Sequence, residues 1–213
     1  MRKVTAAIIG LVLFSFILSI YFYPHVPDQM ATHWDSQGEV NGYMSKFWGS
    51  FFMPLLITGL VILFLVIPKI DPRKENIEMF RKHYEGFRLV LIIFLVLVHL
   101  HILLWNTGTQ ISPNAVIPLG MGLLFYYAGV LTENAEQNWF IGIRTPWTLS
   151  SENVWKRTNC LGGKLFRIAG ITAFSGVFFP EYAIYFILVP AVIVVVITVV
   201  YSYLEYKKEL KEK

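Results

Sequence analysis

Residues 182–203 read YAIYFILVPAVIVVVITVVYSY, a run that contains no Asp, Glu, Lys or Arg. A helix rises about 1.5 Å per residue, so roughly 20 apolar residues cross the hydrocarbon core of a bilayer, which is about 30 Å thick. This run therefore predicts a membrane-spanning helix. Other runs that approach the same length are residues 4–23, 47–67, 87–105, 115–131 and 165–179, the last being the shortest.

The composition of the chain also indicates a membrane protein. Of the 213 residues, 55% are apolar and only 15% are charged, whereas a soluble domain carries about 25% charged residues. The formal charge of +4 comes from basic residues spread along the chain, so direct nucleic-acid binding is not expected. Cys160 is the single cysteine, which excludes an intrachain disulfide and any paired-cysteine motif. We expect an all-α, multi-pass protein of the cell membrane with about six transmembrane helices.

The basic residues predict the orientation. Of the 18 Lys and Arg residues, 17 precede the first run, follow the last, lie between the second and third or the fourth and fifth runs, or stand in the first residues of the third and fifth runs. Because cytoplasmic connections retain positive charge, both ends are expected in the cytoplasm, with Lys46 alone outside. The first run is too long for a signal peptide and lacks a small-residue cleavage site, so it is interpreted as an uncleaved helix.

This topology divides the chain into two halves. Residues 1–105 hold three helices, an external loop at 24–46 and a cytoplasmic helix at 71–86. Residues 106–213 hold the other three helices and a cytoplasmic segment at 132–163. The helix at 71–86 is interpreted as an extension of the third span, or alternatively as the wall of a groove that binds a partner.

The external loop is predicted to be compact. Pro24 and Pro27 end the first helix, residues 30–34 alternate in polarity like a short strand, and residues 35–38 read as a turn. The loop carries potential metal ligands, but they lack a fixed-spacing signature, so a hydrogen-bonded polar loop is preferred to a metal site and no cofactor is expected. The residues concerned are His25, Asp28, His33, Asp35 and Glu39.

The cytoplasmic segment is predicted to contain an irregular stretch and a short helix. Arg144 stands between Gly142 and Pro146, and its planar guanidinium either ties down the loop, binds lipid phosphate, or forms part of a docking platform. A helix that starts after Ser150 or Ser151 is expected to end at residues 162–163 and to lie flat on the inner leaflet. Trp139, Trp147 and Trp155 are assigned to the aromatic belt at that interface.

Few ionisable side chains are expected within the bundle. Apart from tyrosines these are His99 and His101, which point about 200° apart on a helix and so cannot share one small site. One is expected to hydrogen-bond across helices and the other to lie near the outer interface. A transporter that couples to ions would be expected to carry an intramembrane carboxylate or lysine, and none is found in the predicted spans.

Two segments of the sequence carry motifs of a known family. Residues 27–46, PDQMATHWDSQGEVNGYMSK, are similar to the loop after the first helix of the SdpI-like membrane proteins, a family in which Asp often stands where this chain has Asn41. Residues 138–150, NWFIGIRTPWTLS, with Val154 and Trp155 beyond them, are similar to its cytoplasmic signature. The resemblance points to Pro27, His33, Trp34, Gly38, Asn41 and Lys46 outside, and to Asn138, Gly142, Arg144, Thr145, Pro146, Trp147 and Trp155 inside.

The resemblance implies a bacterial or archaeal protein that protects its producer from a secreted toxic peptide. It also implies, in some members, a signalling protein that holds a cytoplasmic transcription repressor at the membrane. The expected partners are membrane lipid, a toxin peptide and such a repressor. A small transporter or permease is the alternative, and a membrane-embedded enzyme is a third class, disfavoured because no phosphate-binding loop, triad spacing or HExxH motif is present.

Overall fold

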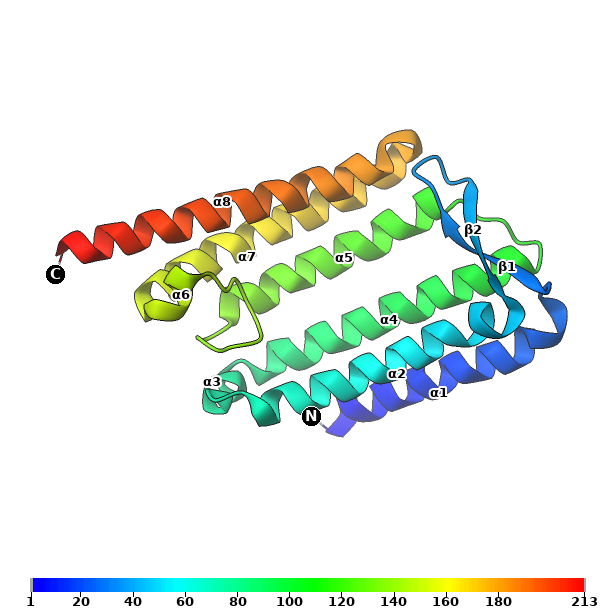
Figure 1. The fold of residues 1–213 in the computed structure, drawn as a ribbon, viewed down its shortest axis with the longest axis horizontal. Helices are drawn as coiled ribbons and strands as arrows, with labels where there is room; N and C mark the ends of the chain where they lie inside the picture. The colour runs from blue at the N-terminus through cyan, green and yellow to red at the C-terminus, as the bar shows by residue number, and fades with distance from the viewer. Residues whose placement is uncertain (1, 213) are drawn as a thin grey trace.

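The computed structural model describes residues 2–212 and consists mainly of long helices lying side by side (Figure 1). Five of these helices are long and apolar enough to cross a membrane, which confirms five of the expected spans. They are α1 (Arg2–Phe22), α2 (Lys46–Ile70), α4 (Arg81–Asn106), α5 (Pro113–Asn134) and α8 (Ala183–Glu212). The remaining expected span, residues 165–179, covers the second half of α7 (Glu152–Ser175) and the 3-10 turn Gly176–Phe178 after it, whereas the first half of α7 carries charged residues.

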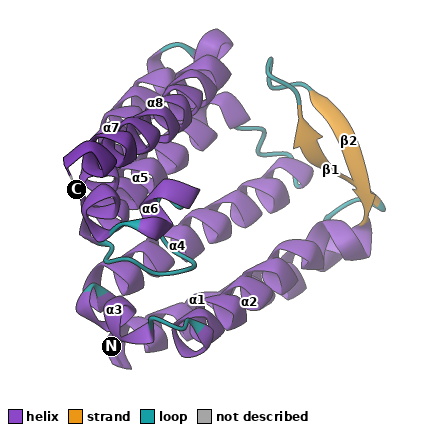
Figure 2. Cartoon of the chain, turned by 60° about the vertical axis from the view of Figure 1, so that its left-hand side comes forward, coloured by secondary structure: helices purple, strands orange, loops and turns teal. Residues whose placement is uncertain are grey.

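A small hairpin follows α1, after the 3-10 turn Tyr23–His25. Strands β1 (Gln29–Trp34) and β2 (Val40–Ser45) pair antiparallel, which confirms the structured loop and corrects the expectation of an all-α protein. The turn between them is held by Asp35, whose Oδ1 accepts hydrogen bonds from the backbone N–H groups of Gln37 and Glu39, both at 2.9 Å. Gly38 has φ +86°, a conformation that favours glycine. The hairpin crosses one end of the helical bundle (Figure 2).

The helices form two groups that meet along α4 and α5. In one group α4 packs against α1 and α2, and in the other α5, α7 and α8 pack together. The hairpin marks one end of the bundle, called here the hairpin end. The chain termini lie at the opposite end with α3 (Lys74–Met79) and α6 (Pro146–Ser150), and this is called the motif end (Figure 1).

Glycines bring α5 and α7 into close contact. A Cβ atom added to Gly129 would lie 2.5 Å from the carbonyl oxygen of Gly163, and one added to Gly170 would lie 2.6 Å from that of Gly122. Small residues of this kind let helix backbones approach each other within a membrane. The expected helix end at Gly162 and Gly163 is therefore wrong: α7 continues through both residues to Ser175, so its first part is not a separate helix lying flat on the membrane.

The predicted helix at 71–86 is divided in two. Asp71 ends α2, α3 runs from Lys74 to Met79, and α4 starts at Arg81 after a break at Phe80. The break does not expose Phe80, which is buried in an apolar cluster with Ile67, Ile77, Tyr84, Leu131, Ala135, Ile141 and Trp155. Residues 81–86 are therefore continuous with the rest of α4, as expected of an extension of the third span, whereas α3 is a separate short helix packed into the motif end.

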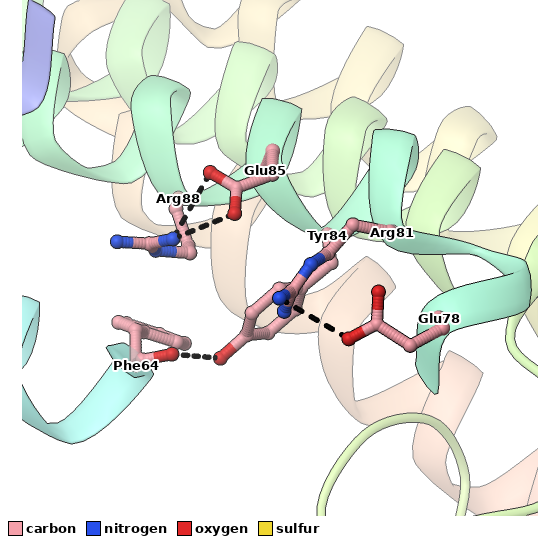
Figure 3. A network of polar contacts seen from close by, with 6 residues as sticks. All are labelled: Phe64, Glu78, Arg81, Tyr84, Glu85 and Arg88. Carbon is pink, nitrogen blue, oxygen red and sulfur yellow. Dashed lines mark hydrogen bonds and ion pairs between the residues drawn. The ribbon is translucent and has the colours of Figure 1, made fainter. Parts of the chain in front are cut away.

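The first turns of α4 contain a buried ion pair. Arg88 Nη1 lies 3.0 Å from Glu85 Oε1, and the two residues are 2% and 7% exposed (Figure 3). Nearby, Arg81 pairs with Glu78 at 3.1 Å, and the Tyr84 hydroxyl donates to the carbonyl of Phe64. This pair adds two buried charged side chains to the histidines expected within the bundle, and each charge in the pair is neutralised by the other.

Candidate functional site

Asn138 shapes the loop at the motif end. Its Oδ1 accepts hydrogen bonds from the backbone N–H groups of Phe140 and Ile141, at 2.9 and 2.7 Å, and its Nδ2 donates to the carbonyls of Glu136 and Ile141. The side chain is fully buried. Because its donors and acceptor are all engaged within the loop, Asn138 holds the backbone path and does not present a polar group to a partner.

Asp71 and Gln137 join this loop to the end of α2. Asp71 is 2% exposed, and its two oxygens accept from the backbone N–H groups of Arg73 at 2.6 Å and Trp139 at 2.9 Å. Gln137 donates to the carbonyls of Thr148 and Leu149 and accepts from the Arg73 side chain. Sequence reasoning missed both residues, since Asp71 before Pro72 looks like the cap of a following helix.

Gly142 and Trp155 pack against each other beneath the loop. Gly142 has φ +101°, and a Cβ added to it would lie 2.6 Å from Asn159 Oδ1 and 3.2 Å from the Trp155 ring. Trp155 is fully buried and its indole N–H donates to the Ala135 carbonyl at 2.7 Å. The assignment of Trp155 to the membrane interface is therefore wrong, and the residue belongs to the core of the motif end.

Thr145 and Pro146 begin α6 and connect it to α8. Thr145 caps the helix by accepting from the backbone N–H of Thr148, and Pro146 occupies the first helical position. The Thr145 hydroxyl also donates to the hydroxyl of Ser202, on α8, at 3.0 Å. A second link between α7 and α8 is the ion pair of Arg157 with Glu205 at 2.6 Å.

The remaining motif residues form a surface patch. Trp139 and Phe140 are 47% and 37% exposed, and Arg144 beside them is exposed. Arg144 Nη1 donates to the Trp139 carbonyl at 2.6 Å, as expected of a residue that ties down the loop. These three residues are called the arginine patch. Trp147 is half-buried and packs on Tyr203, with ring centroids 5.1 Å apart.

At the hairpin end, Trp34 packs between two side chains of α4. Its ring centroid lies 5.5 Å from that of His101 and 5.3 Å from that of Trp105. The Trp34 indole N–H and His101 Nε2 are both buried without a hydrogen-bond partner. His99, by contrast, faces the first helical group, with Nε2 3.0 Å from Ser19 Oγ. The cross-helix hydrogen bond expected of one histidine is confirmed by His99, and His101 packs beneath the hairpin.

The other external motif residues hold the hairpin or lie on its surface. The backbone N–H of Lys46 donates to the Asp28 carbonyl at 2.8 Å, and its ammonium lies 5.1 Å from the centre of the Tyr23 ring. Asn41 is exposed on β2, and His33 is exposed with Nδ1 3.0 Å from the Thr32 hydroxyl. Within residues 2–212, no group of three or more His, Cys, Asp or Glu side chains is placed to hold a metal ion.

Asn106, at the end of α4, fixes the position of β1. Its Oδ1 accepts from the backbone N–H of Ala31 at 2.8 Å, and its Nδ2 donates to the Ala31 carbonyl at 2.9 Å. Pro27 lines an open hollow of about 620 Å³ beside these residues, together with Gln29, Glu39 and others. No sequence motif indicates Asn106. Its side-chain amide pairs with the backbone of Ala31 as a residue of a neighbouring strand would.

A cavity of about 410 Å³ lies beneath the hairpin, where α4, α5 and α8 meet β1. We call it the apolar cavity, because most of its wall is aliphatic. It is lined by Thr32, His33, Trp34, Asp35, Ser36, Val98, His101, Ile102, Pro113, Asn114, Ile117, Pro118, Ala183, Ile184 and Ile187. Of the predicted external motif, only His33 and Trp34 reach it.

A second hollow of about 550 Å³ adjoins the apolar cavity. Ser36 and Asn114 line both spaces, and Asn114 Nδ2 donates to the Ser36 carbonyl at 3.0 Å between them. The rest of its lining is mainly polar: Gln37, Ser112, Pro180, Glu181, Tyr182 and Tyr185. We call this hollow the polar mouth. The two spaces are neighbours, one mainly apolar and the other mainly polar, and we refer to them together as the cleft.

Comparison with known proteins adds to this geometry. The protein named Immunity protein SdpI of Bacillus subtilis (strain 168) is 31% identical over 209 residues, which is 98% of each chain. The chain belongs to the SdpI/YfhL family. The family model described as the SdpI/YfhL protein family matches residues 134–202, and one described as a domain of unknown function, DUF1648, matches residues 10–58. No solved structure matches.

The two matched segments of this family member cover different parts of the molecule. Residues 10–58 contain the hairpin, whereas residues 134–202 start with the motif loop and continue through α7 into α8. The apolar cavity draws its walls from both segments and from α4 and α5, which lie between them in the sequence.

Proposed function

We propose that this membrane protein protects the cell that makes it against a secreted antimicrobial peptide, and that it does so by binding, without catalysis. The observation that carries the proposal is the similarity to an immunity protein over 98% of both chains. A similarity of this extent includes the hairpin end and the motif end alike.

We further propose that α7 is the sixth transmembrane helix and that the hairpin end faces the outside. Packing supports the first point, because α7 lies against both α5 and α8 along the bundle. The charges support the second point: Lys46 is the one Lys or Arg in the external connections, whereas many basic residues lie at the motif end. Six crossings also agree with termini that lie at the same end.

The test is complementation. The chain is expressed in Bacillus subtilis that lacks its own immunity protein, and the cells are exposed to culture supernatant of the parent strain. We expect survival to return to that of cells expressing the resident protein. If the chain accumulates in the membrane at the same level and survival does not improve, the proposed protection is refuted.

A second candidate function is the docking of a cytoplasmic protein on the arginine patch. It is favoured by one observation: Trp139, Phe140 and Arg144 are exposed at the motif end, whereas Asn138, Thr145 and Trp155 of the same motif are buried. Exposed aromatic and arginine side chains are enriched at protein interfaces. Signalling of this kind would place a transcription repressor at the membrane.

Replacing Arg144 with Ala tests this candidate. The change removes one hydrogen bond to the Trp139 carbonyl, so we expect normal accumulation in the membrane but loss of recruitment of the cytoplasmic partner, measured by its membrane fraction. Arg157→Ala, which removes an exposed arginine elsewhere at the same end, serves as the control. Recruitment that persists in the Arg144 variant would argue against docking at the patch.

A further inference from the structure

We propose that the apolar cavity and the polar mouth together form the toxin site, and that they receive the hydrophobic end of a peptide whose positive charge stays at the mouth. This inference rests on the proposed immunity function. It specifies where the toxin binds, which end of the toxin enters the cavity, and the sign of the charge that stays at the mouth.

The size and lining of the apolar cavity suit an apolar segment of a peptide. Its volume of about 410 Å³ lies within the range of about 300–1,000 Å³ that is usual for ligand sites. Ile102, Ile117 and Ile187 contribute aliphatic wall from three different helices. A bulky aliphatic or aromatic side chain placed here leaves water and contacts apolar surface on several sides.

Polar groups in the wall of the apolar cavity favour a peptide over a lipid chain. Thr32, Ser36 and Asn114 line the cavity beside the aliphatic side chains. Their hydroxyl and amide groups can exchange hydrogen bonds with a peptide backbone or a terminal carboxylate. An acyl chain offers no group of this kind.

The charges at the hairpin end favour a cationic ligand. The connections there carry four carboxylates, those of Asp28, Asp35, Glu39 and Glu181, against the single ammonium of Lys46. Glu181 lines the polar mouth and is exposed. A lysine side chain or amino terminus is attracted to this mouth, while the phosphate of an anionic lipid is repelled.

Filling the cavity is the decisive test. Ile117→Trp places an indole in the apolar cavity, whereas Leu119→Trp adds the same side chain two residues further along α5, at a position that is 41% exposed and outside the cavity lining. In the complementation assay we expect the Ile117 variant to lower the tolerated toxin concentration by about tenfold or more. The Leu119 variant should protect like the unmodified chain, and both should accumulate equally.

A charge reversal tests the orientation of the peptide. Glu181→Lys should weaken protection and slow binding of the toxin purified from the same supernatant, because it repels a cation at the mouth. Glu39→Lys is the control, since this carboxylate lines the hollow beside Pro27 and not the polar mouth. Equal effects of the two changes would overturn the assigned orientation.

Photo-crosslinking locates the peptide directly. Benzoylphenylalanine at Ile184, which lines the apolar cavity, should capture labelled toxin, and the same group at Val192 on the outer face of α8, which is 60% exposed, should not. Equal protection by the two tryptophan variants overturns the site, and so does the absence of capture at Ile184. The purified chain can also be analysed for bound phospholipid. If only the Ile117 variant loses that lipid and its protection is unchanged, the cavity binds lipid and the toxin site is overturned.

These results separate the inference from the function on which it rests. If the unmodified chain gives no protection, the immunity function itself fails. If the unmodified chain protects but the Ile117 and Leu119 variants protect equally, the function stands and the cavity is not its site.

Discussion

Replacing Asp71 with Ala should destabilise the motif end more than any change to an exposed carboxylate nearby. Asp71 is 2% exposed, and its two oxygens accept from the backbone N–H groups of Arg73 and Trp139. Hydrogen bonds to a charged group contribute about 1.5–3 kcal/mol each. Since both N–H groups are only partly buried, we take the lower value for each bond and expect a loss of about 3 kcal/mol, or about a hundredfold in the unfolding equilibrium.

The loss can be measured by denaturant unfolding of the purified protein in detergent. Asp71→Asn retains one acceptor oxygen and should lose about half as much stability as Asp71→Ala. Glu75→Ala, in the first turn of α3 and exposed to solvent, is the matched control and should change stability by no more than about 0.5 kcal/mol. If Asp71→Ala unfolds at the same denaturant concentration as Glu75→Ala, Asp71 does not join α2 to the loop in the way described.

Three further predictions follow from the packing, the topology and the polar loop. Gly163→Leu should cost about 3 kcal/mol in denaturant unfolding or prevent folding, because its Cβ would lie 2.7 Å from the Gly129 carbonyl oxygen; Gly10→Leu, with no neighbouring atom within 4 Å, should not. Cysteines placed at Ser36 and Asn41 should react with a membrane-impermeant thiol reagent in intact cells, while native Cys160 should react only after lysis; the opposite pattern reverses the orientation. A chelator should leave the melting temperature unchanged, and a fall that one transition metal restores would reveal a metal site.

The spans could be predicted because their signal is local. A run such as residues 47–67 needs no partner to be identified, and the structure places α2 around it. The structured loop could also be predicted from the sequence, since Pro27, the alternating residues after it and Gly38 are all local signals. Failures arose where the role of a residue depends on its neighbour in space.

Gly163, Trp155 and Asp71 illustrate such failures. Two consecutive glycines usually end a helix, but here Gly163 faces Gly129 and allows close packing of α5. Tryptophan is usually placed at the membrane interface, but the carbonyl of Ala135 satisfies the Trp155 indole in the core. Nothing near Asp71 in the sequence indicates that it accepts from Trp139, 68 residues away.

The candidate site was predicted only in part for the same reason. The motif residues were identified from the sequence. Their different roles were not: the polar atoms of Asn138 all form hydrogen bonds within its own loop, whereas Arg144 is exposed. The apolar cavity was not foreseen at all. Its walls come from residues 32–36, 98–102, 113–118 and 183–187. Nothing in these four separate segments of sequence indicates a shared role, because they come together only when the helices pack.

The position of the hairpin also determines when the cleft can form during synthesis. The ribosome makes β1 and β2 first, yet the wall that completes the cavity includes Ala183, Ile184 and Ile187 of the last helix. Until α8 inserts, the cavity beside Trp34 lacks the part of its wall that α8 provides. A nascent or truncated chain therefore lacks a complete cleft, and only a fully inserted molecule contains the whole of the proposed toxin site.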